Sequence, residues 1–256
     1  MRELWQEGRT CECDAYPDSF CSNGICETTT PVGPGTKTGT KIREVDGPDR
    51  CNINSGMTDV VRDIFLNKHN YYRSLVAKGL AKDKFGGNAP KAARMRKMVY
   101  DCDVEASALR HAEKCRWGHS NKLERLGLGE NVWATAVPEM NRSVAAEMSC
   151  ESFFTELERY GVGQDNVLTN ELFYRQKEQI GHYTQMVWQD SYKLGCVVEY
   201  CDTPPAPMTF VVCQYGPGGN FIDQIIYEKG EPCQTDDDCK CTGCKCSRDE
   251  ALCIMP

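Results

Sequence analysis

Two histidines and two glutamates are the side chains of this sequence that could act together in chemistry. They are His119 just after a predicted helix, Glu130 at a predicted strand start, Glu156 beside the apolar seam of a predicted helix, and His182 in an aromatic, amide-rich run. Imidazole nitrogens bind divalent metal ions, and carboxylates bind the same ions or orient the imidazoles. The same groups could serve as general acids and bases. Because they are scattered along the chain, spacing alone leaves open a purely structural role for each.

Helical patterns place two of these four side chains. The apolar spacing over 59–76 predicts a helix behind a Thr58 cap, ending at Gly79. A second helix, capped by Asp101 or Asp103, should end just before His119. A third should run from a Ser143 cap to Tyr160, which sets Glu156 beside its apolar seam. The basic stretch 92–98 also fits a short helix.

Strand patterns supply the rest of the predicted domain. Residues 127–134 fit a turn followed by a strand, with Glu130 at the junction. The β-branched runs 195–201 and 209–215 predict two further strands. Helices and strands together indicate one α/β domain over 51–228, which also contains His182 in the run GHYTQMVWQDS.

Cysteines dominate both flanks of that domain. Residues 1–27 form a cysteine-rich tail, 28–50 a Thr/Pro/Gly linker, and 229–256 a second cysteine-rich segment. Seventeen cysteines indicate an oxidising, extracellular compartment. The domain holds an odd number, seven, and Cys150 on an apolar helix stripe is the candidate for a buried, inert free thiol. In the last segment, Cys241-x-x-Cys244 lacks a completed zinc set, so disulfides are expected there.

Charge and hydropathy exclude two classes of partner. The net charge of −7 argues against nucleic acid as the main ligand, because phosphate binding needs a basic surface. The sequence has no run of roughly 18 apolar residues, so no transmembrane helix is expected. Neither G-x-S-x-G nor H-E-x-x-H occurs, which argues against the common serine hydrolases and zinc proteases.

Four motifs in order resemble the CAP superfamily, also called SCP/TAPS. GHYTQMVWQDS at 181–191 and FVVCQYGPGGNFI at 210–222 resemble its two long signatures. GHS at 118–120 and GEN at 129–131 resemble the two short ones. The runs GGNAPKAARM, KLGC and YEKGEPC most resemble venom-allergen-like, or activation-associated secreted, proteins of parasitic nematodes.

This resemblance implies a fold and a site. The fold would be an α-β-α sandwich, with an antiparallel sheet between helical layers and a disulfide-held hinge after it. The cavity tetrad of the family maps onto His119, Glu130, Glu156 and His182. His119 and His182 would hold a divalent cation, often zinc. Phe153 stands where the family usually has a Trp, which we interpret as a packing change.

The resemblance also implies a function without catalysis. A secreted protein of this kind would bind a sterol or fatty acid and modulate host immunity. The sterol-binding loop would lie at about 200–210, and its apolar residues are Tyr200, Pro204, Pro205, Met208 and Phe210. One alternative is a protein–protein module that engages a host receptor without lipid. Another is a hydrolase using the tetrad, with Ser120 or Ser191 as nucleophile. Homodimers occur in the family, and Asn141-Arg-Ser143 is a glycosylation sequon.

Overall fold

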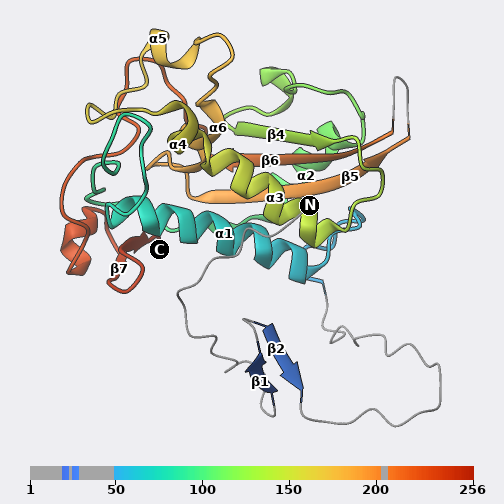
Figure 1. Ribbon diagram of the computed structural model, residues 1–256, viewed down its shortest axis with the longest axis horizontal. Helices are drawn as coiled ribbons and strands as arrows, with labels where there is room; N and C mark the ends of the chain where they lie inside the picture. Colours follow the sequence, from blue (N-terminus) through green and yellow to red (C-terminus); the bar gives the residue numbers. More distant parts are fainter. Residues whose placement is uncertain (1–18, 23–24, 29–48, 203–206) are drawn as a thin grey trace. The chain divides into compact units, whose positions relative to one another are not determined.

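The computed structural model describes residues 19–22, 25–28, 49–202 and 207–256. The chain forms two compact units, Met1–Asp46 and Gly47–Pro256. In the first unit, β1 (Ser19–Ser22) pairs antiparallel with β2 (Ile25–Thr28), which places Cys21 opposite Cys26. The tetrad lies in the second unit, described below by itself (Figure 1).

A four-stranded sheet forms the middle layer of the second unit. Its strands are β3 (Val99–Tyr100), β4 (Gly129–Thr135), β5 (Lys193–Cys201) and β6 (Met208–Gly216), in the order β3-β5-β6-β4. β6 pairs antiparallel with both β5 and β4, whereas the two-residue β3 joins β5 in parallel. The predicted antiparallel sheet is therefore confirmed for three strands, and β3 makes the sheet mixed.

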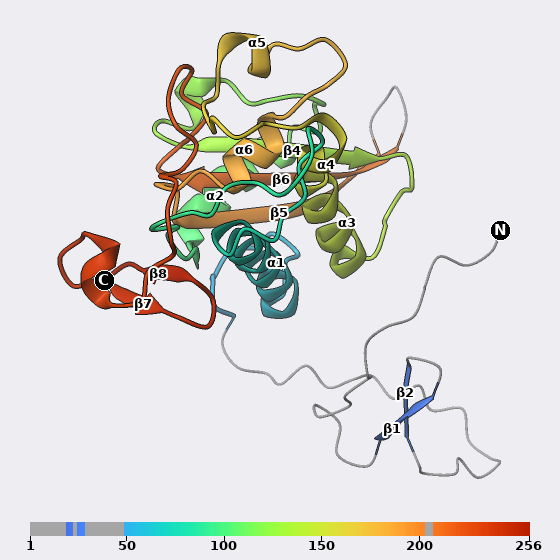
Figure 2. The same cartoon turned by 60° about the vertical axis from the view of Figure 1, so that its left-hand side comes forward.

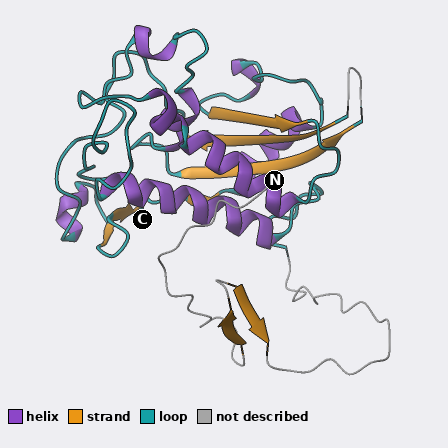
Figure 3. Cartoon of the chain, in the orientation of Figure 1, coloured by secondary structure: helices purple, strands orange, loops and turns teal. Residues whose placement is uncertain are grey.

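Helices cover both faces of this sheet. The side chains of β6 alternate between the faces, as the period of a strand requires. Val211, Cys213 and Tyr215 belong to the core that α1 (Asp59–Ala77) and α3 (Arg142–Phe154) cover. Phe210 and Val212 join a second core with α2 (Cys102–Ala112). Figures 1 and 3 show α1 and α3 in front of the sheet and α2 behind it, so the predicted α-β-α sandwich is confirmed.

The ends of the first two helices follow the sequence signals. The Thr58 side chain accepts a hydrogen bond from the Val61 amide and so caps α1. Gly79 follows the helix with a φ of +68°, a left-handed conformation that favours glycine. Asp101 caps α2 by accepting hydrogen bonds from the amides of Asp103 and Val104. The predictions for these ends are confirmed.

The helix predicted over 92–98 is wrong. This segment contains a bend and no helix, and it forms isolated bridges that pair Ala92 with Lys229 and Arg96 with Cys253. The Cys253 amide donates to Met95 O at 2.8 Å, and the Lys97 amide donates to Cys253 O at 2.7 Å. Pairing with distant residues therefore overrides the local helix propensity.

The helix predicted from Ser143 to Tyr160 is also partly wrong. Asn141, not Ser143, caps it by accepting hydrogen bonds from the Ser143 and Val144 amides. α3 ends at Phe154, and a separate helix α4 (Glu156–Tyr160) follows. Two more short helices, α5 (Asn170–Phe173) and α6 (Gly181–Met186), come before β5. As a result Glu156 begins a helix of its own.

Disulfides brace the described part of this unit. Three of them, Cys51–Cys102, Cys115–Cys201 and Cys196–Cys213, lie within 51–228, and three more, Cys233–Cys246, Cys239–Cys253 and Cys241–Cys244, close the C-terminal segment. That segment contains the 3-10 helix η2 (Asp236–Cys239) and a hairpin of β7 (Lys245–Ser247) with β8 (Leu252–Ile254), all visible in Figure 2. Cys150 is free and fully buried, as predicted, and burial raises its pKa, which keeps the thiol inert.

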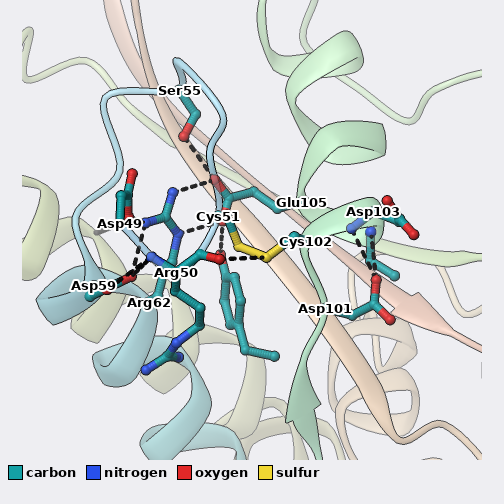
Figure 4. The surroundings of a disulfide bond; sticks show 12 residues. Asp49, Arg50, Cys51, Ser55, Asp59, Arg62, Asp101, Cys102, Asp103 and Glu105 are labelled. Atoms are coloured by element: carbon teal, nitrogen blue, oxygen red, sulfur yellow. Dashed lines mark hydrogen bonds and ion pairs between the residues drawn. A yellow bond between two sulfur atoms is a disulfide. The ribbon is translucent and has the colours of Figure 1, made fainter. Parts of the chain in front are cut away.

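A buried ion pair accompanies the Cys51–Cys102 disulfide (Figure 4). Arg62 on α1 donates through Nε and Nη2 to the Glu105 carboxylate on α2, at 2.7 and 2.8 Å. Ser55 and Tyr100 each donate a hydroxyl hydrogen bond, 2.8 Å long, to the same carboxylate. The disulfide and the ion pair together fix the segment 51–55, which leads into α1, to both helical layers.

Among the described residues, no helix is long and apolar enough to cross a membrane.

Candidate functional site

His119 and Glu130 form the first half of the site. Glu130 is the second residue of β4, opposite Gln214 on β6. Its Oε1 accepts from the Ser120 amide at 2.8 Å and lies 3.1 Å from His119 Nδ1. Its Oε2 accepts from Ser120 Oγ at 2.6 Å and Gln214 Nε2 at 2.9 Å. The carboxylate is buried, whereas the His119 side chain is 54% exposed.

Glu130 is a stable anion. Burial alone would raise its pKa, but the hydrogen bonds from His119, Ser120 and Gln214 outweigh burial and lower the pKa to about 2. At neutral pH the carboxylate therefore takes a hydrogen bond from His119 Nδ1. This fixes the tautomer and leaves the lone pair on Nε2.

His182 and Glu156 form the second half. Glu156 Oε1 accepts from His182 Nδ1 at 2.6 Å. Its Oε2 accepts from the amides of His182 and Tyr183, both at 3.0 Å. These amides open α6, where backbone donors lack partners within the helix, so Glu156 caps α6 and orients the ring at once. The Phe153 ring stacks on the imidazole, with centroids 4.9 Å apart and planes 24° apart.

Direct contact between β4 and α6 joins the two halves. Asn131 Nδ2, next to Glu130, donates to His182 O at 2.9 Å. Gly129 allows the strand to come close, since a Cβ there would lie 1.9 Å from Gln185 Oε1. Each residue of the GEN motif thus has a structural reason. Gly129 permits contact, Glu130 orients one imidazole, and Asn131 holds the segment that carries the other.

Each half of the site has the form of a metal-ligating histidine with its orienting carboxylate. Carboxylates that hold Nδ1 are the usual outer partners of metal-bound histidines. Neither Nε2 of His119 and His182 has a hydrogen-bond partner among the residues that the structure describes, so both are available to an ion such as zinc. Zinc bound there would act as a Lewis acid or as a structural tie.

The other metal-like cluster of the described chain does not fit an ion. Cys233, Cys239 and Cys253 bring their sulfur atoms within 4.8 Å of one another, the only such trio of ligand atoms in the described ranges. All three sulfurs belong to disulfides, so no thiolate is present.

His69 is a polar residue near the site that sequence reasoning did not single out. It is fully buried on α1, with Nδ1 2.7 Å from Phe65 O and Nε2 2.9 Å from the Tyr215 hydroxyl. Burial lowers its pKa to about 4, so the ring is neutral and donates from Nδ1. The Tyr215 hydroxyl also accepts from Asn131 Nδ2 at 3.1 Å. The spacing of four from Phe65, on the apolar stripe of α1, was the available signal.

The two candidate nucleophiles are occupied away from the imidazoles. Ser120 Oγ donates to Glu130, as described above. Ser191 Oγ donates to Pro217 O at 2.6 Å and accepts from Gln185 Nε2 at 3.1 Å. A serine nucleophile needs a base within hydrogen-bond reach, and neither hydroxyl bonds to a described histidine ring.

The residues predicted to bind sterol differ in how deeply they are buried. Phe210 is fully buried against His111 and Trp117. Tyr200 is half-buried, and its hydroxyl donates to Met140 O at 2.9 Å. Met208 is partly exposed, and Pro204 and Pro205 lie outside the described residues. Tyr200 and Met208 are therefore the described members that keep some exposed surface, and the buried part of Met208 packs against the second core.

Asn141 is exposed, as a glycosylation site must be. Its Oδ1 caps α3, so a glycan on Nδ2 would leave the capping atom in place.

Comparison with known proteins agrees with this geometry. Residues 66–215 match the family model described as "CAP: Cysteine-rich secretory protein family". The chain is 46% identical over 258 residues to the Ancylostoma secreted protein of Ancylostoma caninum, covering 99% of the chain and 56% of that relative. It is 33% identical over 198 residues to human cysteine-rich secretory protein 3, covering 73% of the chain and 71% of the relative.

Solved structures show the same likeness. Na-ASP-1 superposes with a TM-score of 0.80 at 47% identity, over 97% of this chain and 58% of that one. NaASP2, solved with Zn²⁺, superposes with a TM-score of 0.71 at 47% identity, over 79% of this chain and 99% of that one. The chain thus spans little more than half the length of the Ancylostoma protein and of Na-ASP-1. With its sandwich fold and these relatives, it belongs to the CAP family of cysteine-rich secretory proteins and is similar to hookworm venom-allergen-like proteins.

Proposed function

We propose that this chain is a secreted, non-enzymatic CAP protein that binds a divalent cation through Nε2 of His119 and of His182. One observation carries the proposal: each imidazole is fixed through Nδ1 by a carboxylate, and each Nε2 is unengaged among the described residues. The Zn²⁺ in the structure of the NaASP2 relative supports zinc as the ion. The occupied serines favour a binding role over hydrolysis.

Secretion is supported by the oxidised cysteines and by the relatives. The six disulfides of the described chain require an oxidising compartment. The Ancylostoma relative is named a secreted protein. We further propose that the protein binds a sterol or fatty acid and modulates host immunity, as the family resemblance implies.

Calorimetric titration of zinc into the full chain tests the cation site. One saturable site is expected. His119→Ala and His182→Ala should each weaken it by more than the roughly 10–100-fold typical of losing an outer partner of a metal ligand. Asp249→Asn, an exposed carboxylate in the C-terminal segment, should leave the affinity unchanged. Zinc affinity in both histidine variants equal to that of the unsubstituted chain would refute the site.

A cholesterol-binding assay tests the lipid proposal separately. Met208→Ser should weaken binding if the 200–210 loop is the site, because Met208 is partly exposed. Leu80→Ser, an exposed apolar position just after α1 and outside that loop, is the matched control. Phe210 is unsuitable for the test, since a polar side chain there would damage the core. Binding that is absent, or equal in the two variants, would remove the loop assignment.

A host receptor is the second candidate partner, and one surface favours it. Trp117, Leu123 and Leu126, all within seven residues of His119 in sequence, are strongly exposed. Exposed apolar groups gathered along one segment are typical of protein-binding surfaces. Leu123→Ser, the most exposed of the three, should then weaken receptor binding and leave zinc and cholesterol binding intact.

A further inference from the structure

A cleft of about 300 Å³ lies on the α2 side of the sheet, next to the Glu130 end of the tetrad. It is bounded by α2 from its Asp101 cap to Arg110, by Lys193 at the start of β5, and by residues among 124–128. This last segment follows the 3-10 helix η1 (Lys122–Glu124) and leads into β4. None of the four tetrad residues lines the cleft. Its volume is at the lower end of the range for small-molecule sites.

Two buried hydrogen-bonding atoms in the cleft wall are unengaged. Ser107 is only 5% exposed, and its Oγ has no partner among the described residues. Arg125 has a side chain that is 11% exposed, and its Nε is likewise buried and without a hydrogen bond in the described chain. Glu130 Oε1 lies 3.6 Å from that Nε, beyond hydrogen-bond distance. Buried polar atoms without partners are uncommon, so this pair indicates a place for a ligand.

The charges around the cleft favour an anion. Lys193 pairs with Asp101 at 2.8 Å, and Lys114 pairs with Glu124 at 2.7 Å, so these two acids are already neutralised. Glu130, behind Arg125, has its own set of hydrogen-bond donors.

Arg110 remains as a cation in the wall. Its described hydrogen bond goes only to Ala106 O of its own helix, at 3.2 Å. Asp103, which is exposed, is the acid left in the lining, and Figure 4 shows it beside Asp101 at the start of α2. The wall thus has two buried donor atoms without a hydrogen bond, Ser107 Oγ and Arg125 Nε, and one guanidinium without an ion pair, Arg110, against a single exposed carboxylate without a described partner.

The remaining wall is apolar and is formed by Val104, Leu126 and Leu128. We propose that this cleft binds a small carboxylate with an apolar body. The carboxylate accepts hydrogen bonds from Ser107 Oγ and Arg125 Nε, with Arg110 adding charge, and the apolar body contacts Leu126 and Leu128. Guanidinium groups are well suited to this recognition.

Benzoate is the probe that tests this site, and benzamide is its neutral match. Both are titrated into the ¹⁵N-labelled full chain in the presence of a chelator, so the result is independent of the cation site. We expect saturable shifts of the Val104, Ser107 and Leu126 amides with benzoate, and affinity for benzamide lower by about tenfold, as expected for losing a charge-assisted hydrogen bond. No saturable shifts with benzoate, or equal affinity for benzamide, would overturn the proposal.

Variants locate the site on the molecule. Ser107→Ala and Arg110→Gln should each weaken benzoate binding several-fold, with the native spectrum otherwise kept. Arg116→Gln removes an exposed arginine that does not line the cleft and should have no effect. Equal losses in Arg110→Gln and Arg116→Gln would show non-specific charge attraction and contradict the assignment. Arg125 is left unchanged because it also hydrogen-bonds Leu128 O and lies close to Glu130.

Discussion

The buried histidine of α1 and the two histidines of the tetrad differ in how many ring nitrogens the protein uses. His69 has both nitrogens engaged, by Phe65 O and by the Tyr215 hydroxyl. His119 and His182 each have only Nδ1 engaged among the described residues. The first ring is shut inside the core, whereas the His119 and His182 side chains keep 54% and 22% of their surface exposed.

This difference separates a packing histidine from a ligand. A ring with two internal partners stabilises the fold and has no lone pair left for an ion. A ring with one carboxylate partner is held in place and offers its second nitrogen. Substitution of His69 or its partners should therefore lower the stability of the fold. Substitution in the tetrad should affect metal affinity more than stability.

The largest effect should come from acid on His69. The folded-state pKa is about 4, below the ordinary value of about 6.5, so the unfolded chain takes up a proton first as pH falls. The stabilisation is complete above pH 6.5 and should decline by about 3 kcal/mol between pH 6.5 and pH 4. Urea unfolding at pH 7, 5.5 and 4 measures this loss. His69→Gln should lack it, and an equal decline in that variant would contradict the role of His69.

Glu130 should produce a loss of the same size at lower pH. Its folded-state pKa of about 2 lies below the ordinary value of 4.5, so its contribution is complete above pH 4.5. About 3 kcal/mol should disappear as pH falls from 4.5 to 2. The difference in unfolding free energy between the unsubstituted chain and Glu130→Gln, measured across this pH range, gives the contribution of the Glu130 carboxylate. A constant difference would mean that Glu130 is not held as an anion.

Removal of the carboxylate that orients His182 should weaken zinc binding. Glu156→Ala frees the ring and uncaps α6, so zinc affinity should fall by roughly 10–100-fold, with about 1 kcal/mol of lost stability. Calorimetry and urea unfolding give the two numbers. Glu158→Ala, an exposed glutamate on the same helix, should change neither. A loss of stability with full zinc affinity would make Glu156 a helix cap alone.

The smallest effect should come from the Tyr215 hydroxyl, which connects His69 with Asn131 next to the tetrad. Tyr215→Phe deprives His69 Nε2 of its donor and Asn131 of one acceptor, which should cost about 1–2 kcal/mol of stability. Asn131 keeps its hydrogen bond to His182 O, so zinc affinity should change by no more than about threefold. Such a change corresponds to less than about 1 kcal/mol of binding free energy. A larger change would show that the buried region controls the site.

Local sequence signals predicted much of the fold. The Thr58 cap, the Asp101 cap and Gly79 act through their own neighbours, so the ends of α1 and α2 could be read from the chain. Runs of β-branched residues likewise predicted β5 and β6. Cys150 could be identified from an odd count and an apolar helix position.

The features that depend on contacts between distant residues could not be predicted from the sequence. Residues 92–98 have helical propensity, but their backbone partners lie near residues 229 and 253, which no local pattern reveals. Ser143 and Asn141 are both good caps two residues apart, and only the structure shows which one is used. The four tetrad positions came from motifs, whereas their division into two Nδ1-bound pairs depends on the register of β4 with β6 and on the contact of β4 with α6.

Zinc K-edge X-ray absorption of the zinc-loaded full chain tests the central claim most directly. If His119 and His182 are the ligands, the spectrum should show two imidazole nitrogens at about 2.0–2.1 Å, completed by oxygen and without sulfur. His119→Ala and His182→Ala should each remove one imidazole contribution. Sulfur at about 2.3 Å, or a spectrum that neither substitution changes, would contradict the account.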